Sequence, residues 1–299
     1  MNKTQIKIFL IALPLVVAIF GCATTTPMPK VSTVASTNVS AVALSQLEIG
    51  PWTYPETSAW GMTGSSCEQS APPQQSPIDF TKFPSFTSWV AKTSLASISQ
   101  VPNGKFDAHD QNVVFMPFTR TQIIISPGVG GTMAFNYTLL GFHFHQPPEH
   151  IVVANQKGMA EMHIKASDQF GDIAVFAFLM EPSSGTDTSL TSLLPTIQNA
   201  ITNTGPATVN AVNFSPVLYK FSTSYYYSYM GSLTTPPCTT NIRWYVLASP
   251  LTASADVLTS LLTALGTAGM PNGGTLPHGN ARYPQTLTSP PPTVYMVFP

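Results

Sequence analysis

The sequence predicts a mainly β fold of the α+β class: one large, mostly antiparallel central sheet with a few short surface helices, in a single domain. Only 8% of the 299 residues are charged and 28 are proline, which argues against a helical bundle. Strand-like runs rich in Thr, Val, Phe and Tyr recur between Pro and Gly turn signals. Stretches with helical spacing are few, so helices are expected only as additions to the sheet.

The predicted elements follow one another along the residues after position 110. Strands are expected at Asn112–Thr119, Gln122–Ser126, Thr138–Gln146, Met159–Ala166, Ile173–Met180, Ser224–Met230 and Ile242–Ala248. Surface helices are expected at Leu190–Asn203 and Ala255–Leu265.

The first 22 residues are typical of an export signal rather than of a folded segment. Lys3 and Lys7 flank the start of an apolar run, Ile8–Phe20, that is too short to cross a bilayer comfortably. The run ends in Gly21-Cys22, which resembles a bacterial lipobox, so Cys22 is predicted to be the lipidated first residue of the mature chain. Ordinary cleavage nearby and an uncleaved anchor are the alternatives. An exported protein, periplasmic or anchored to the outer membrane of a Gram-negative bacterium, is expected.

A tether and one globular domain are expected after the signal. Residues 23–50 are rich in Thr, Ser, Val and Ala and read as a flexible linker, and residues 51–299 read as the domain. Without Lys3 and Lys7, ten basic residues face thirteen acidic ones, and no basic run is present. Nucleic acid is therefore not an expected partner, and membrane contact is expected only through a lipid on Cys22. The sequence does not indicate an oligomeric state.

Cys67 and Cys238 are the cysteines that remain outside the signal. In an exported chain such a pair suggests a disulfide, with two buried free thiols as the alternative.

Histidines at two-residue spacing suggest a metal site. His143 and His145 share one face of a predicted strand, and Glu161 and His163 share one face of the next. If these strands pair, three imidazoles converge and leave a fourth position open, as in a catalytic zinc site. Zinc is the favoured metal because imidazole ligands and an open position suit it.

The chain resembles the α-class carbonic anhydrases over nearly the whole predicted domain. The motifs that carry the resemblance are Trp60-Gly61, QSPID at Gln75–Asp79, FHFH at Phe142–His145, Glu149-His150, Glu161-Met162-His163, GSLTTPP at Gly231–Pro237, Trp244 with Val246-Leu247, and N-x-R-x-x-Q at Asn280–Gln285. The resemblance implies that the chain hydrates carbon dioxide reversibly, with Zn²⁺ on His143, His145 and His163, and that bicarbonate is the product.

The resemblance also implies which groups orient the ligands. Glu161 would accept a hydrogen bond from His163, and the backbone carbonyl of Asn280 would accept one from His145. Arg282 belongs to the same motif. At the position where the family usually has a glutamine for His143, this chain has Gly141. A glutamine introduced there is expected to tighten metal binding if the missing side chain matters.

Further roles follow from the resemblance. Glu149 would accept the hydroxyl proton of Thr234, which orients the nucleophile; taken alone, the Thr-Thr-Pro-Pro segment would be read as a turn. Carbon dioxide would lie against an apolar wall of Val175, Leu233 and Trp244, and Asn112 and Thr235 are further residues implied in the pocket. Lys165 departs from the family pattern, and it either crowds the wall as a cation or extends its ammonium to solvent.

His109 is the residue that the resemblance implies as proton shuttle, because an imidazole titrates near neutral pH. A second alignment places Lys105 at that position instead. The remaining alternative is that His109 is an exposed loop histidine with no role.

Two other functions fit parts of the pattern. His143, His145 and Glu149 also resemble the first metal motif of a cupin, although the second motif is absent. A zinc-binding relative of the carbonic anhydrases with little activity is the other alternative.

Overall fold

The computed structural model describes residues 52, 54, 58–61, 65–68, 73–83, 88–91, 94–98, 102–109, 112–126, 135–156, 158–204, 208–209, 212–267 and 279–298. The chain divides into two units, Met1–Ser45 and Gln46–Pro299, and all described residues belong to the second. The predicted signal, the lipidation site at Cys22 and the linker lie outside the described residues. Among the described residues, no helix has both the length and the apolar character needed to cross a membrane.

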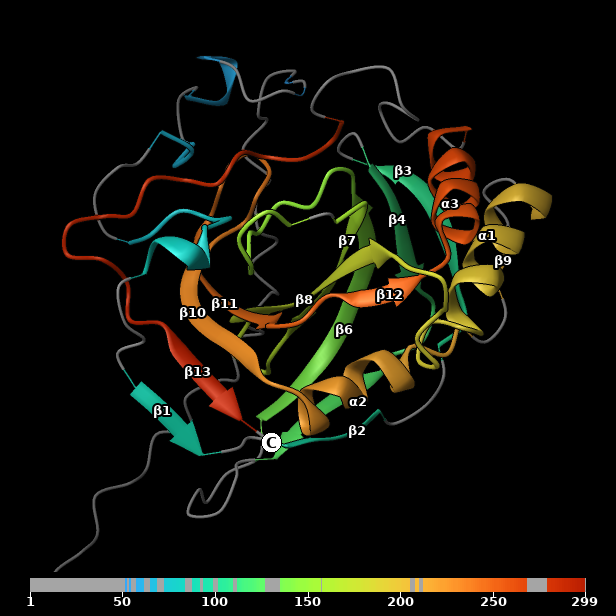
Figure 1. Cartoon of the computed structure of the whole chain (residues 1–299), viewed down its shortest axis with the longest axis horizontal. Coiled ribbons are helices and arrows are strands. Elements are labelled where there is room, and N and C mark those ends of the chain that lie inside the picture. Colours follow the sequence, from blue (N-terminus) through green and yellow to red (C-terminus); the bar gives the residue numbers. More distant parts are fainter. Residues whose placement is uncertain are drawn as a thin grey trace, which may run out of the picture. The chain divides into compact units, whose positions relative to one another are not determined.

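A mixed, mostly antiparallel sheet dominates the fold (Figure 1), which confirms the predicted fold class. Its strands are β1 (Ser88–Ala91), β2 (Ser94–Ile98), β3 (Gly104–His109), β4 (Asn112–Pro117), β5 (Gln122–Ser126), β6 (Phe135–His145), β7 (Ala160–Ser167), β8 (Ile173–Pro182), β9 (Thr208–Val209), β10 (Tyr226–Ser232), β11 (Thr240–Leu247), β12 (Leu251–Ala253) and β13 (Tyr295–Phe298). Their order in the sheet is β1-β13-β10-β11-β8-β7-β6-β4-β3-β9, with β5 on β2 and β6, and β12 on β8.

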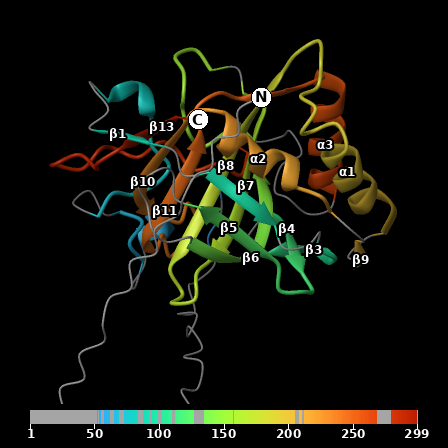
Figure 2. The same ribbon diagram turned by 90° about the horizontal axis from the view of Figure 1, so that it is seen from below.

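The helices are short and lie on the surface, as expected. They are α1 (Leu193–Thr204), α2 (Ser215–Thr223) and α3 (Ala255–Thr267), with single 3₁₀ turns at Ser58–Gly61 and Phe80–Lys82. In Figures 1 and 2, α1 and α3 lie side by side near the end of the sheet that carries β3 and β4. All predicted strands and helices are present, and α2 and several short strands were not predicted.

The central strands are buried on both faces, and alternation along each strand separates two clusters. On β7, Met162 and Ile164 belong to the larger core, which also holds the apolar faces of the three α-helices. The residues between them, Glu161 and His163, point to the opposite face. That face carries the smaller apolar cluster around Trp244 and the polar groups described below.

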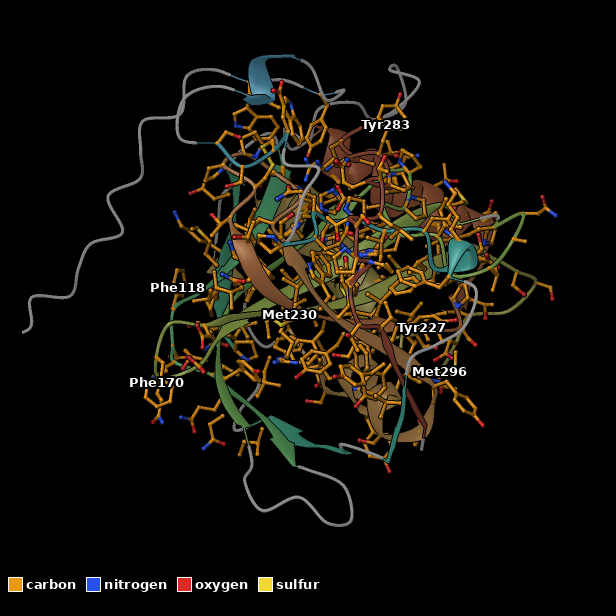
Figure 3. The ribbon with its side chains drawn as sticks, turned by 90° about the vertical axis from the view of Figure 1, so that its left-hand side faces the viewer. Phe118, Phe170, Tyr227, Met230, Tyr283 and Met296 are labelled. Atoms are coloured by element: carbon orange, nitrogen blue, oxygen red, sulfur yellow. A yellow bond between two sulfur atoms is a disulfide. The ribbon has the colours of Figure 1, made fainter. Side chains whose placement is uncertain are left out.

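Large apolar side chains are also exposed at turns of the sheet. Phe118 follows β4 and is 56% exposed, and Phe170 lies between β7 and β8 and is 82% exposed. Both lie at the margin of the view in Figure 3, away from the buried clusters.

Candidate metal centre

The register of β6, β7 and β8 brings the three predicted ligands together. His143 on β6 pairs directly with His163 on β7, and His145 lies two residues further along β6 on the same face. One ring nitrogen from each imidazole lies within 4.8 Å of the other two, and Nε2 of His143 and Nε2 of His145 are 3.0 Å apart. Nitrogens that share a tetrahedral zinc lie about 3.4 Å apart, so the three imidazoles fit such an ion.

The outer nitrogens of two ligands are already engaged. Nδ1 of His145 donates to the carbonyl oxygen of Asn280 at 2.7 Å, and Nε2 of His163 donates to Oε1 of Glu161 at 2.8 Å. These bonds leave Nε2 of His145 and Nδ1 of His163 without a proton and free to bind a metal.

Burial favours the neutral, ligating form of each imidazole. It lowers the pKa of His145 to about 3, with His163 adding to the effect. Burial likewise lowers the pKa of His163, and it lowers that of His143 well below the usual range with help from its neighbours. Neutral imidazoles are the form that a divalent metal requires.

Glu161 is the centre of the hydrogen-bond network behind the ligands. Its Oε2 accepts from the backbone amides of Glu149 and His150, both at 2.8 Å, and its Oε1 accepts from the rings of His150 and His163. Burial alone would raise the pKa of Glu161, but the imidazoles of His150 and His163 and their hydrogen bonds hold it well below its usual range. The carboxylate is therefore ionised and fixes the proton of His163 on Nε2.

His150 extends this network, and sequence reasoning assigned it no role. Its Nδ1 donates to Glu161, so its Nε2 accepts from the hydroxyl of Tyr229 at 2.8 Å, and Tyr229 lies 2.7 Å from the hydroxyl of Ser76. His150, Glu161 and His163 also form a second group close enough to hold a metal. Their hydrogen bonds to one another explain that proximity, so they support the ligand site rather than forming another.

Glu149 lies beside the ligands but outside the ligand group. Its Oε1 accepts from the backbone amide of Arg282 at 2.8 Å, and its Oε2 lies 3.9 Å from Nδ1 of His163. Burial, followed by the charge of Glu161, raises the pKa of Glu149 well above its usual range, and the Arg282 amide and the Thr234 hydroxyl act in the opposite direction. A nearby divalent cation would lower this pKa and so favour the ionised form.

Asn280 and Arg282 bring the C-terminal segment onto the site. The side chain of Asn280 accepts from the amide of Gln146 at 2.8 Å and donates to the carbonyl of Phe144 at 2.9 Å, which clamps the segment to the end of β6. Arg282 is buried, and its guanidinium donates to the carbonyls of Cys67 and Ser76 at 2.6 and 2.8 Å.

Cys67 and Cys238 form the predicted disulfide, which links positions 171 residues apart. Cys238 ends the loop that carries Thr234, and its amide donates to the carbonyl of Thr235 at 2.8 Å. The disulfide therefore ties this loop to the segment that Arg282 holds.

The predicted apolar wall lies on the ligand face. Val175 and Trp244 are buried in the smaller cluster, with Leu233 packed against it. The ring of Trp244 lies edge-on to that of His163 at 4.9 Å between centroids. Asn112 is buried too, and its side chain accepts from the amide of Val113 at 2.9 Å.

Gly141 and Lys165, which depart from the family pattern, face each other in the register of β6 and β7. A Cβ at position 141 would collide with the carbonyl oxygen of Phe115 on β4, so a glutamine does not fit there. The structure therefore contradicts the expectation that glutamine at this position would tighten metal binding. Lys165 is partly buried.

The structure places the backbone of the predicted proton shuttle at the end of a hairpin strand. His109 ends β3 and pairs with Asn112 across the hairpin. Lys105, the competing residue, pairs with Asp107 at 2.7 Å and is partly exposed. The role of His109 stays a prediction.

Comparisons with known proteins agree with these features. Residues 55–290 match the family model of the eukaryotic-type carbonic anhydrases. The carbonic anhydrase of Nostoc sp. is 35% identical over 120 residues, 40% of this chain and 43% of the relative. That of Pectobacterium carotovorum is 30% identical over 150 residues, 48% of this chain and 57% of the relative. The chain thus spans about half the length of the curated relatives it matches. The α-carbonic anhydrase of Photobacterium profundum has the same fold, with a TM-score of 0.55 and 21% identity over 82% of this chain and all of that one.

Proposed function

The chain belongs to the eukaryotic-type carbonic anhydrase family, and from that premise we propose that it catalyses the reversible hydration of carbon dioxide to bicarbonate and a proton. The observation that carries the proposal is the convergence of His143, His145 and His163 with the outer nitrogens of two of them already hydrogen-bonded. A site of this kind binds zinc with an open position for catalysis.

The residues divide the work between binding, orientation and proton transfer. His143, His145 and His163 would hold the zinc, which would act as a Lewis acid and would lower the pKa of a bound water to about 7. Glu149 accepts a hydrogen bond from the hydroxyl of Thr234. The oxygen of Thr234 can then only accept from the nucleophile, which orients it. Val175, Leu233 and Trp244 present an apolar surface to carbon dioxide, which carries no charge.

The released proton needs a carrier, and His109 is proposed for that role because its ordinary pKa is near neutral. Replacing His109 with alanine is expected to lower the hydration rate in weak buffer and to leave it nearly unchanged in concentrated imidazole buffer. The same test on Lys105→Met distinguishes the two positions.

A stopped-flow assay of carbon dioxide hydration with zinc quantification tests the proposal. The native protein is expected to bind one zinc and to hydrate carbon dioxide, and His163→Ala is expected to lose both properties. Thr234→Val is the matched control, since it is expected to keep zinc and to lose rate. Zinc binding without hydration in the native protein would instead support a zinc-binding relative with little activity.

Two observations count against the cupin alternative. In that reading Glu149 is a metal ligand, whereas here it lies outside the ligand group and accepts from Arg282. The family match covers both halves of the site.

We also propose that the protein is exported and anchored by a lipid on Cys22, in the periplasm or at the outer membrane. A disulfide fits an oxidising compartment. Labelled palmitate is expected to enter the native protein and not Cys22→Ala. Label in both proteins would contradict the anchor.

A further inference from the structure

Lys165 lies on the face of the sheet that carries the ligands. Its neighbours in β7, Ile164 and Ala166, belong to the larger core on the opposite face. Strand alternation therefore places Lys165 on the same face as His163, two residues away. The side chain of Lys165 is partly buried, so it is not a fully solvated surface lysine.

The two strands beside Lys165 leave room for its side chain. On β6 it pairs with Gly141, where the carbonyl of Phe115 excludes any Cβ. On β8 it pairs with Val175, which is buried and apolar. No side chain can stand opposite Lys165 from β6, and this gap lies two pairs along from His143 and His163, on the same face.

The charge of Lys165 acts on the ligand site. Burial and the other imidazoles are the main causes of the lowered pKa of His143, and the charge of Lys165 contributes in the same direction. Residues two apart on a strand lie about 7 Å from one another, so the side chain of Lys165 is long enough to reach the space beside His163. The ammonium of Lys165 would repel a divalent metal in the neighbouring site. It would attract an anion that contacts both the ammonium and the metal.

We propose that Lys165 is an anion-binding residue of the site, which holds a small monovalent anion such as bicarbonate next to the metal. The proposal rests on the proposed function, because bicarbonate is the product of that reaction. An ammonium offers three donors and a full charge to an anion, and it offers nothing comparable to neutral carbon dioxide. Lys165 thus favours the anionic side of the reaction and makes the enzyme sensitive to inorganic anions.

Anion titrations of the cobalt-loaded protein test the role of Lys165. Cobalt(II) replaces spectroscopically silent zinc, and its visible absorption is followed as sodium bicarbonate or sodium thiocyanate is added at constant ionic strength. Lys165→Met removes the charge and keeps the length, and Lys165→Arg keeps the charge. Lys82→Met is the matched control, since Lys82 is 70% exposed and pairs only with Asp79 at 3.6 Å among the described residues. Carbon dioxide hydration is measured on zinc-loaded samples of the same proteins.

Loss of a charge-assisted hydrogen bond is expected to weaken anion binding about tenfold in Lys165→Met. Lys165→Arg and Lys82→Met are expected to bind both anions as the native protein does. Equal dissociation constants for native protein and Lys165→Met would overturn the role of Lys165, and normal hydration in the same samples would leave the proposed function intact. Anion binding that depends on Lys165 without any hydration would support Lys165 and refute the proposed function. Failure of cobalt to bind would overturn both.

Discussion

Replacing Glu161 with glutamine tests the reasoning about proton positions most directly. The carboxylate accepts from two backbone amides at Oε2 and from the rings of His150 and His163 at Oε1. A glutamine has nearly the same shape but only one acceptor oxygen. Whichever way the amide is turned, one pair of buried donors faces an NH₂ group.

The cost can be worked out from that pair. Each buried donor that loses its acceptor costs about 1–3 kcal/mol, so the metal-free protein is expected to lose roughly 3 kcal/mol of unfolding free energy. If the amide nitrogen faces the two rings, His163 relieves the conflict by moving its proton to Nδ1, the atom that would bind metal. Loss of such a partner typically lowers metal affinity 10- to 100-fold, and that range is expected here.

Two assays on Glu161→Gln separate these effects. Zinc affinity is measured by competition with a chromophoric chelator, and the stability of the metal-free protein is measured by urea unfolding. Glu68→Gln is the control, because Glu68 is exposed. If Glu161→Gln kept both the zinc affinity and the stability of the native protein, Glu161 would not be fixing the proton of His163.

Three further predictions concern stability and the C-terminal segment. Removing the disulfide with Cys67→Ser and Cys238→Ser is expected to cost about 5 kcal/mol in the chain-entropy model, since the bond closes a loop of 171 residues; urea midpoints that match the native protein would contradict this. Burial raises the pKa of Tyr245 well above its usual range, so the folded chain keeps the phenol protonated while the unfolded chain ionises it above pH of about 10. The free energy of unfolding should therefore fall as pH rises above that value. In Tyr245→Phe this fall should be shallower by up to about 1.4 kcal/mol per pH unit. If the native protein and Tyr245→Phe lost stability at the same rate between pH 9 and 11, Tyr245 would not be the cause. Gly279 has a φ of +52°, and a Cβ there would collide with the carbonyl of Gln146. Gly279→Ala is expected to displace Asn280 and to weaken zinc binding in the chelator assay, and unchanged affinity would show that the segment adapts.

Local patterns were enough to predict the strands that carry the ligands. Alternation along β6 and β7 placed His143, His145 and His163 on one face, and burial on both faces fixed the register that joins them. The short strands and α2 were missed because their residues lack a periodic pattern of sufficient length. α2 begins with Pro216 in its first turn, which reads equally well as a loop.

The supporting network could not be predicted from spacing alone. Tyr229 and Ser76 lie 79 and 74 residues from His150 in the chain, and only the folded sheet brings their hydroxyls together. Gly141 illustrates the same limit. In sequence it looks like a missing ligand partner, whereas in the structure it is the only kind of residue that lets β4 approach β6.

The order in which the chain supplies the site has a consequence for metal acquisition. The three histidines and Glu161 all precede residue 165, whereas the carbonyl that orients His145 and the amide that holds Glu149 come from residues 280 and 282. A chain emerging from the ribosome presents its imidazoles more than a hundred residues before these partners exist. For the proposed zinc site, tight and correctly oriented metal capture is therefore expected late in biogenesis, after the C-terminal segment has been made.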